Sequence, residues 1–305
     1  MLNFTKIEIF RNLTQPATIT ELSEILKFDQ STISKAVDSL EKDGFVVRQK
    51  KGKEVHVSRS DSLHSQALKD IILEFPRIPW DKIFTTSSLH VLGALECKHS
   101  IADIAGMTGL DRRTVSSAIR ESGKYGIILK IGNKYILSER HSLVRKFVSN
   151  FWQYVTNKKL RDISLESVLI WQRGPEFLFK LDNESDMNVT EVKNCKIQPT
   201  AINVFHKYGL KILSDTAYFF CTKRNLRPED YFIHTILIDP HSPIYNSYAL
   251  AFSSKLEQAD LFKIGRHYNM ENHIEKLLEY LATMKKNSDF VLPWNEYESL
   301  LKDLE

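Results

Sequence analysis

The 305-residue sequence predicts an α+β protein in which two similar modules of helix, tight turn, helix and hairpin precede an α/β domain. Two observations predict this organisation. The first half contains an ungapped internal repeat, which indicates two copies of one module. From about residue 165 the helical spacing gives way to alternating, strand-like stretches mixed with helices.

The repeat is found when the sequence is compared with itself after a shift of 82 positions, which places Ile19 on Ile101. Apolar residues then fall on apolar residues, and the turn residues coincide. The matched pairs include Asp29 with Asp111, Thr32 with Thr114, Ile33 with Val115 and Gly44 with Gly126. We therefore expect two copies of one module of roughly 80 residues.

The helices of the first copy are predicted from capping residues and apolar spacing. Thr20 is expected to cap a helix that ends near Leu26, with Leu22, Ile25 and Leu26 on its buried side. After a turn at Lys27 and Phe28, Asp29 is expected to cap a second helix. In this helix Ile33, Val37 and Leu40 recur at three- and four-residue steps and so face the core.

A hairpin follows the second helix. Asp43-Gly44 ends the helix, because glycine tolerates the left-handed conformation. Phe45–Gln49 and Glu54–Ser58 then alternate as two strands around Lys51-Gly52. Helix, tight turn, helix and hairpin together make a winged helix-turn-helix.

The second copy repeats these signals. Ser100 begins a capping-box pattern for a helix over Ile101–Met107, and Asp111 is expected to cap a helix running to about Ser122. Ile127–Ile131 pairs with Lys134–Ser138 as a shorter hairpin. The repeat therefore predicts a second winged helix.

Helical segments surround the second copy. Leu63–Glu74 has helical spacing, and Asp81–Leu95 is expected to be the first helix of the second copy. His141–Leu160 is an amphipathic helix with one apolar stripe. This stripe suits either simple core packing or a linking helix that dimerises; its members are Val144, Phe147, Val148, Phe151, Trp152 and Val155.

The stretch ITELSEILKFDQSTISKAVDSLEKDGFVVR resembles the winged-helix regulators of the MarR and ArsR type. The resemblance covers about residues 1–60 closely and about residues 85–140 less closely. It implies that the second helix of each module is a recognition helix that enters the major groove of DNA, with its first residues nearest the base edges.

This resemblance assigns candidate DNA-binding residues in both copies. Glutamine, serine, threonine, lysine and arginine side chains can pair with base edges, and basic wing residues reach phosphates. In the first copy the candidates are Gln30, Ser31, Thr32, Ser34 and Lys35 on the helix, and Arg48, Lys50, Lys51 and Lys53 on the wing. In the second they are Arg112, Arg113, Thr114, Ser116 and Ser117 on the helix, and Lys130 and Lys134 on the wing.

Charge is unevenly distributed along the chain. Residues 1–160 carry 25 basic and 17 acidic side chains, whereas the remainder carries 17 basic and 21 acidic ones. A basic first half attached to an acidic second half fits binding of a polyanion by the winged helices.

The C-terminal region is expected to mix strands and helices. Strands are predicted over Ser167–Gln172, Phe177–Leu181, Lys211–Leu213 and Ala217–Thr222. Helices are predicted over Pro199–Tyr208, Pro228–Asp239, Asn246–Ser254, Leu256–Tyr268, Glu271–Lys285 and from Pro293-Trp294 onward.

The segments IWQRGPEFLFK, PTAINVFHKYGL and PEDYFIHTILID resemble the C-terminal part of archaeal multi-winged-helix regulators and the abortive-infection antitoxin family. The second resemblance implies a fold akin to nucleotidyltransferases. The Gly-Ser turn and paired acids that such enzymes need are missing, so a degenerate, inactive fold is expected. We also find no phosphate-cradling loop, nucleophile elbow or zinc-protease motif, and expect no enzyme, cofactor or metal.

The remaining sequence features place the protein in a cell compartment. No apolar run approaches the roughly 20 residues that would span a bilayer, and the N-terminus lacks the apolar core of a signal peptide. Cys97, Cys195 and Cys221 are far apart in sequence, which predicts neither a disulfide framework nor a paired-cysteine zinc site. We expect a cytoplasmic protein in a reducing environment.

The predicted organisation is a first winged helix over residues 1–78, a second over 79–140, a linking or dimerisation helix over 141–164, and a regulatory or assembly domain over 165–305. The predicted function is that of a sequence-specific, double-stranded DNA-binding transcriptional regulator, as a homodimer, with a partner protein as a further option for the C-terminal domain. The alternatives are an antitoxin that represses its own promoter and binds a toxin, a replication or chromosome-maintenance factor, and a nucleotidyltransferase.

Overall fold

The computed structural model describes residues 2–182, 191–192 and 195–304. The chain forms two compact units. Unit 1 comprises Met1–Thr156 and Arg173–Pro175, and unit 2 comprises Asn157–Gln172 and Glu176–Glu305. The structure therefore groups the two winged helices, predicted as separate domains, in one unit.

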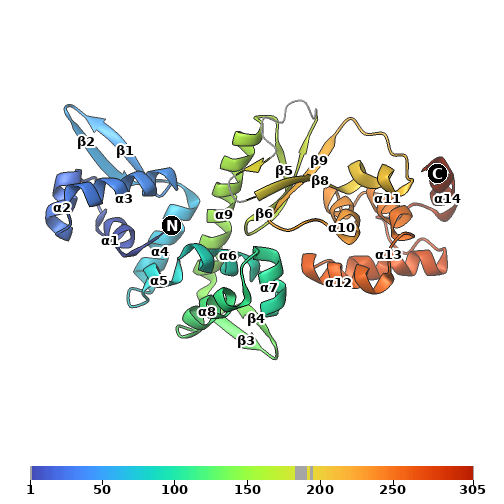
Figure 1. The fold of residues 1–305 in the computed structure, drawn as a ribbon, viewed down its shortest axis with the longest axis horizontal. Coiled ribbons are helices and arrows are strands. Elements are labelled where there is room, and N and C mark those ends of the chain that lie inside the picture. The colour runs from blue at the N-terminus through green and yellow to red at the C-terminus, as the bar shows by residue number, and fades with distance from the viewer. Residues whose placement is uncertain (1, 183–190, 193–194, 305) are drawn as a thin grey trace. The chain divides into compact units, whose positions relative to one another are not determined.

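The first winged helix in unit 1 follows the predicted order (Figure 1). Its hairpin is antiparallel, with Val46 opposite Arg59 and Lys51 opposite Glu54. The elements are α1 (Phe4–Asn12), α2 (Ile19–Leu26), α3 (Gln30–Lys42), β1 (Val46–Lys51) and β2 (Glu54–Arg59).

The second winged helix is preceded by three helices and has a shorter hairpin, in which Ile128 lies opposite Leu137. Its capping box at Ser100 and its Asp111 cap are confirmed. The elements are α4 (Leu63–Glu74), α5 (Trp80–Ile83), α6 (Thr86–Ala94), α7 (Ile101–Thr108), α8 (Arg112–Gly123), β3 (Ile128–Ile131), β4 (Lys134–Leu137), η1 (Glu139–His141) and α9 (Ser142–Ile163).

Several local predictions in unit 1 are wrong. Thr18, not Thr20, caps α2: its hydroxyl accepts from the Glu21 amide, and the Glu21 carboxylate accepts in return from the Thr18 amide. Ile25 is 59% exposed rather than buried, whereas Leu22 is fully buried and Leu26 is half-buried.

The predicted helix over Asp81–Leu95 is divided into α5 and α6. Phe84 ends α5, and the Thr85 hydroxyl then accepts a hydrogen bond from the Ser88 amide, which starts a new helix. The side chains of Trp80, Ile83 and Phe84 are fully buried around this break. The chain packs these three side chains into the core at the break between α5 and α6. The helical spacing of the sequence did not predict this break.

The apolar stripe of α9 lies in the core of unit 1. Val144, Phe147, Val148, Phe151 and Trp152 belong to one continuous cluster that also contains buried residues of both winged helices. The ring of Phe147 lies 4.5 Å from Phe84 and 6.3 Å from Phe45, measured between centroids. The stripe therefore packs both modules together within one chain, as the core-packing interpretation expects.

Unit 2 is built on an antiparallel sheet with the strand order β5-β6-β9-β8-β7 (Figure 1). The strands β7 and β8 were not predicted. The strands are β5 (Val168–Arg173), β6 (Glu176–Leu181), β7 (Glu191–Val192), β8 (Cys195–Pro199) and β9 (Ala217–Thr222). The predicted strand over Lys211–Leu213 is absent, and Leu213 lies fully exposed in a loop.

The helices of unit 2 agree with most of the expected ranges. The segment predicted as a helix over Pro199–Tyr208 is a 3-10 helix, η3 (Ala201–Tyr208). The others are α10 (Pro228–Ile238), α11 (Pro243–Ser253), α12 (Gln258–Tyr268), α13 (Glu271–Thr283) and α14 (Trp294–Leu304).

The sheet of unit 2 has an apolar side chain layer on each face. Leu178, Tyr218 and Phe220 pack with the helices in the larger core cluster. Phe179 and Phe219, on the alternate positions of the same strands, pack with the end of α9 in a smaller cluster. Alternate side chains of a strand point to opposite faces, so strands buried on both sides are apolar throughout, as β9 is.

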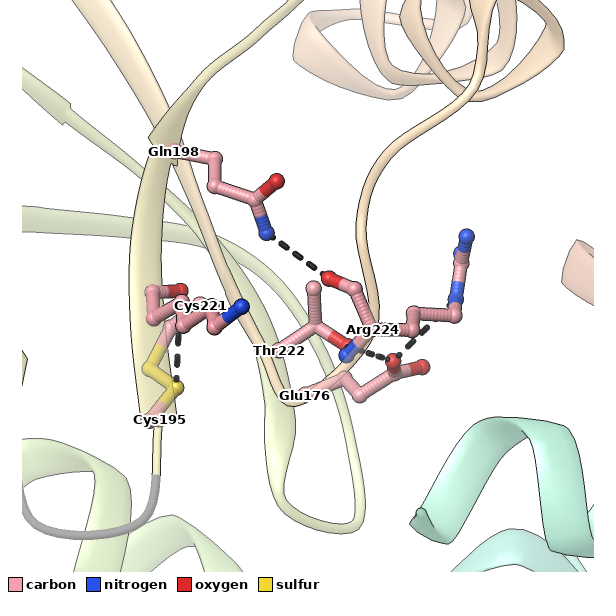
Figure 2. The surroundings of a disulfide bond; sticks show 7 residues. Glu176, Cys195, Gln198, Cys221, Thr222 and Arg224 are labelled. Carbon is pink, nitrogen blue, oxygen red and sulfur yellow. Dashed lines mark hydrogen bonds and ion pairs between the residues drawn. A yellow bond between two sulfur atoms is a disulfide. The ribbon is translucent and has the colours of Figure 1, made fainter.

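A disulfide joins Cys195 on β8 to Cys221 on β9, with the Cα atoms 5.7 Å apart (Figure 2). The prediction that the cysteines do not pair is wrong. The antiparallel pairing of β8 with β9 brings together two residues that are 26 positions apart in the sequence. Cys97 is free.

A buried polar network lies beside the disulfide. Thr222 donates a hydrogen bond to Glu176, the Arg224 guanidinium lies 3.6 Å from the same carboxylate, and the Gln198 amide donates to the Arg224 carbonyl (Figure 2). Arg224 also makes two hydrogen bonds of 2.6 and 2.7 Å to the fully buried Asp230. This bidentate pair ties the loop after β9 to the start of α10.

One fully buried histidine and one half-buried histidine predict that acid destabilises unit 2. His234 lies between the Thr200 hydroxyl and the Tyr268 hydroxyl, each at 2.7 Å. Burial lowers the pKa of His234 to about 3 and that of His273 to about 4. An unfolded histidine has a pKa of about 6.5, so between these pKa values the unfolded chain binds more protons than the folded chain. Stability therefore falls as the pH is lowered.

The midpoint of thermal unfolding is therefore expected to fall as the pH is lowered from 7.5 to 5. The variant His234→Gln, which keeps one donor and one acceptor, is expected to show a weaker pH dependence. A midpoint that does not change over this range would show that these histidines are not held in the neutral form.

Candidate nucleic-acid interface

The recognition helix of the first copy, α3, is anchored by apolar residues and presents polar ones. Ile33, Val37 and Leu40 are fully buried, as predicted. The opposite face carries Gln30, Ser31, Thr32 and Lys35, all exposed, and Ser34, half-buried. This arrangement leaves the first two turns of the helix open to a ligand.

The start of α3 lies next to α2. The side chain amide of Gln30 lies 3.4 Å from the hydroxyl of Thr20, so Thr20 contacts the recognition helix instead of capping α2. Asp29 occupies the N-cap position of α3, but its side chain makes no capping hydrogen bond within the described residues. The predicted capping role of Asp29 is therefore not confirmed.

The first wing carries three exposed lysines at its tip. Lys50 and Lys51 lie at the end of β1, and Lys53 follows Gly52, which has a φ of +64° in the turn. Glycine is favoured there because the backbone is left-handed. The tip therefore presents positive charge on a short, hydrogen-bonded hairpin.

Arg48 has a different environment from the wing lysines. Its guanidinium contacts Asp38 at 2.5 Å and Glu41 at 2.8 Å, both on α3, and its backbone amide donates to Glu41. These contacts hold the wing on α3. The expected contact of Arg48 with DNA stays a prediction.

The predicted recognition helix of the second copy, α8, begins with a strong cap. Asp111 accepts hydrogen bonds from the amides of Arg113 and Thr114 at 2.9 Å and from the Thr114 hydroxyl at 2.7 Å. The hydrogen bonds from Thr114 hold the pKa of the Asp111 carboxyl below its ordinary value. The Thr114 hydroxyl is thus occupied in capping the helix.

Basic side chains follow one face of α8. Arg112, Arg113 and Ser117 are exposed, and Ser116, half-buried, donates to the Arg112 carbonyl at 2.8 Å. Among the described residues, neither arginine has an acidic partner within ion-pair distance. With Arg120, these residues line an open pocket of about 350 Å³.

Sequence reasoning missed Arg120. It lies four residues after Ser116 and eight after Arg112, a spacing that places the three residues on the same helix face. The second wing adds less charge than the first: Lys130 is exposed and Lys134 is half-buried. Positive charge in the second copy is therefore concentrated on the recognition helix.

No group of three or more histidine, cysteine, aspartate or glutamate side chains in the part of the chain that the structure describes is placed to hold a metal ion. Likewise, none of the described helices is long and apolar enough to cross a membrane.

Comparison with known families identifies the first copy. Residues 11–53 match the MarR family. The matched range extends from the end of α1 through α2, α3 and β1 to the tip of the first wing. The N-terminal part is therefore a winged helix-turn-helix of MarR type, and the match supports a DNA-binding transcriptional regulator in general terms.

A second family model covers the C-terminal part of the chain. Residues 195–305 match the family described as HVO_2833_C, C-terminal, which is an archaeal-type domain. The MarR match and the mixed helices and sheets of the structure agree with the predicted α+β fold class. The second copy, α7 to β4, lies outside both matched ranges. A search of the curated proteins found no match.

Proposed function

We propose that this protein is a cytoplasmic, sequence-specific, double-stranded DNA-binding transcriptional regulator that uses both winged helices. The observation that carries the proposal is the repeated construction of α3 and α8. Each helix buries its apolar face in the same core and exposes a polar or basic face, and each is followed by a wing.

The DNA contacts proposed for each helix and wing follow from the charge that it carries. In the first copy, Gln30, Ser34 and Lys35 would contact base edges, and the wing lysines would contact phosphates. In the second copy, Arg112 and Arg113 would read bases, since arginine suits guanine. The shared core supports joint binding, because it holds both helices in one compact unit.

We also propose a homodimer, as regulators with MarR domains commonly are. Its contact would lie outside the apolar stripe of α9, which the chain buries in its own core. Unit 2 would then serve in regulation or assembly.

The wing is tested by replacing Lys50, Lys51 and Lys53 with alanine. Binding to every duplex is expected to weaken, because phosphate contacts do not depend on sequence. In a log–log plot of affinity against salt concentration, the slope is expected to fall by up to about 0.9 for each phosphate contact that is lost.

The matched variant replaces Ser34 and Lys35 with alanine. These residues lie on the exposed side of α3, so the fold should be kept while the preference among sequences is relaxed. A wing variant with the salt slope of the wild type would remove the wing from the proposed interface. If the helix variant kept full specificity, α3 would not be the reader.

A further inference from the structure

The end of the recognition helix α3 is held by a buried histidine that follows the wing. In the first copy the helix α3 ends at Lys42, and Asp43 to Phe45 lead directly into β1. The Asp43 carbonyl is hydrogen-bonded to Nε2 of His64 at 2.9 Å. His64 lies in the first turn of α4 and is 1% exposed.

The neighbouring carbonyls are bound from the same segment. The Gly44 carbonyl accepts hydrogen bonds from the Ser60 and Ser62 hydroxyls at 2.5 and 2.8 Å, and the Phe45 carbonyl accepts one from Ser65 at 2.9 Å. Three successive carbonyls are thus satisfied by side chains that come after the wing. The residues before and after the hairpin are fixed to each other.

Helix α9 also packs against His64 and Gly44, through Tyr154. The His64 ring lies 4.6 Å from the ring of Tyr154 and 4.7 Å from that of Phe45, between centroids. Gly44 has a φ of +76°, and a Cβ built on it would collide with the Tyr154 ring. Glycine is required here for both reasons: the backbone is left-handed, and an aromatic ring occupies the space of the side chain.

The second copy has a buried histidine in the corresponding place, without the hydrogen bond that His64 makes. His141 follows the second wing and is 4% exposed, and its Nδ1 has no hydrogen-bond partner among the described residues; Gly126, in the turn after α8, has a φ of +70°. A Cβ on Gly126 would lie 3.9 Å from the His141 ring. The other face of this ring packs against Phe75, with centroids 5.0 Å apart.

We propose that His64 is a positioning residue for DNA binding, which fixes the segment through which α3 passes into its wing. This inference rests on the proposed function. A helix and a wing can engage one duplex together only if the angle between them is set before binding. A donor that joins the helix end to the residues after the wing sets this angle.

The test uses two substitutions of His64 in the full-length chain. His64→Phe keeps an aromatic ring but removes the donor, and His64→Gln keeps a donor that can reach the Asp43 carbonyl. Affinity is measured for the best duplex from a random-sequence selection and for a scrambled duplex of equal length, together with the midpoint of urea unfolding.

His64→Phe is expected to lower affinity for the preferred duplex roughly three- to ten-fold, the effect of one net hydrogen bond on a pre-organised site. Affinity for the scrambled duplex should change little, and His64→Gln should recover most of the loss. Ser247→Ala is the matched control: it removes a fully buried hydroxyl that donates to the Pro243 carbonyl at 2.7 Å within unit 2, outside both winged helices. It should leave the ratio of the two affinities unchanged.

An unchanged ratio in His64→Phe would overturn the inference while leaving the proposed function in place. If His64→Phe does not fold, Ser62→Ala, which removes one of two donors to the Gly44 carbonyl, is expected to lower the ratio in the same direction, and an unchanged ratio there overturns the inference equally. A wild-type protein that binds the two duplexes equally would contradict the proposed function itself, and the inference with it.

Discussion

Replacing Arg112 and Arg113 with alanine is expected to weaken binding to the preferred duplex by about 1–3 kcal/mol for each arginine that reads a base. Both side chains lie exposed in the first turn of α8, with no acidic partner among the described residues. Removing them eliminates base contacts and leaves the helix intact, because the Asp111 cap uses the backbone amides and Thr114.

The measurement is a titration of the preferred duplex combined with a protection footprint. The footprint should become shorter on one side of each half-site. Lys69→Ala, which removes an exposed positive charge on α4 away from both recognition helices, is the control and should change neither the affinity nor the footprint. A full-length footprint with undiminished affinity would mean that the second winged helix serves assembly.

Replacing Asp230 with alanine is expected to destabilise unit 2 by about 3–5 kcal/mol, because it leaves a charged guanidinium without its buried partner. Burial opposes ionisation of Asp230, but the hydrogen bonds and charge of Arg224 outweigh it, and the pKa of the carboxyl lies below its ordinary value. The pKa of Arg224 is raised by the same pair against the effect of burial.

This loss is measured by urea unfolding of the full chain. The control is Arg227→Ala, which breaks a neighbouring ion pair with Glu229 whose arginine side chain is 55% exposed. An exposed pair contributes about 0–1 kcal/mol, so the control should unfold close to the wild type. Equal stability of Asp230→Ala and the wild type would show that the pair does not stabilise the domain.

The sequence was sufficient to predict both winged helices because their signals are local and are repeated. Asp111 caps α8, Ser100 starts α7 in a capping box, and Gly44 and Gly126 follow the two recognition helices in left-handed conformations. Each of these residues acts through a few neighbours in the chain. Because the second copy repeats these signals, the same helices and turns could be predicted in both copies.

Features that depend on distant partners could not be predicted. Arg48 was predicted as a wing residue for DNA, and its ion pairs with Asp38 and Glu41 on α3 were not predicted. The disulfide depends on the pairing of β8 with β9, and β8 gave no strand signal because Cys195–Pro199 is short and ends in proline. Arg120 is an exception, since the helical spacing from Arg112 alone would have revealed it.

The apolar stripe of α9 shows the same limit. Its spacing predicted a buried helix face but not the surface that covers it, and packing within one chain and packing between two chains give the same pattern. The structure places Phe147 and Phe151 against residues of both winged helices. This contact makes one unit of two modules that the sequence alone presents as separate.

Selection of bound sequences from a pool of random duplex DNA, carried out with the full chain, tests the central claim most directly. If α3 and α8 both read bases from one rigid unit, the recovered duplexes should share two preferred stretches at a fixed spacing. In the same selection, the variant with Arg112 and Arg113 replaced by alanine should retain one stretch and lose the other. Recovery of sequences with no shared stretch would contradict sequence-specific binding by this protein.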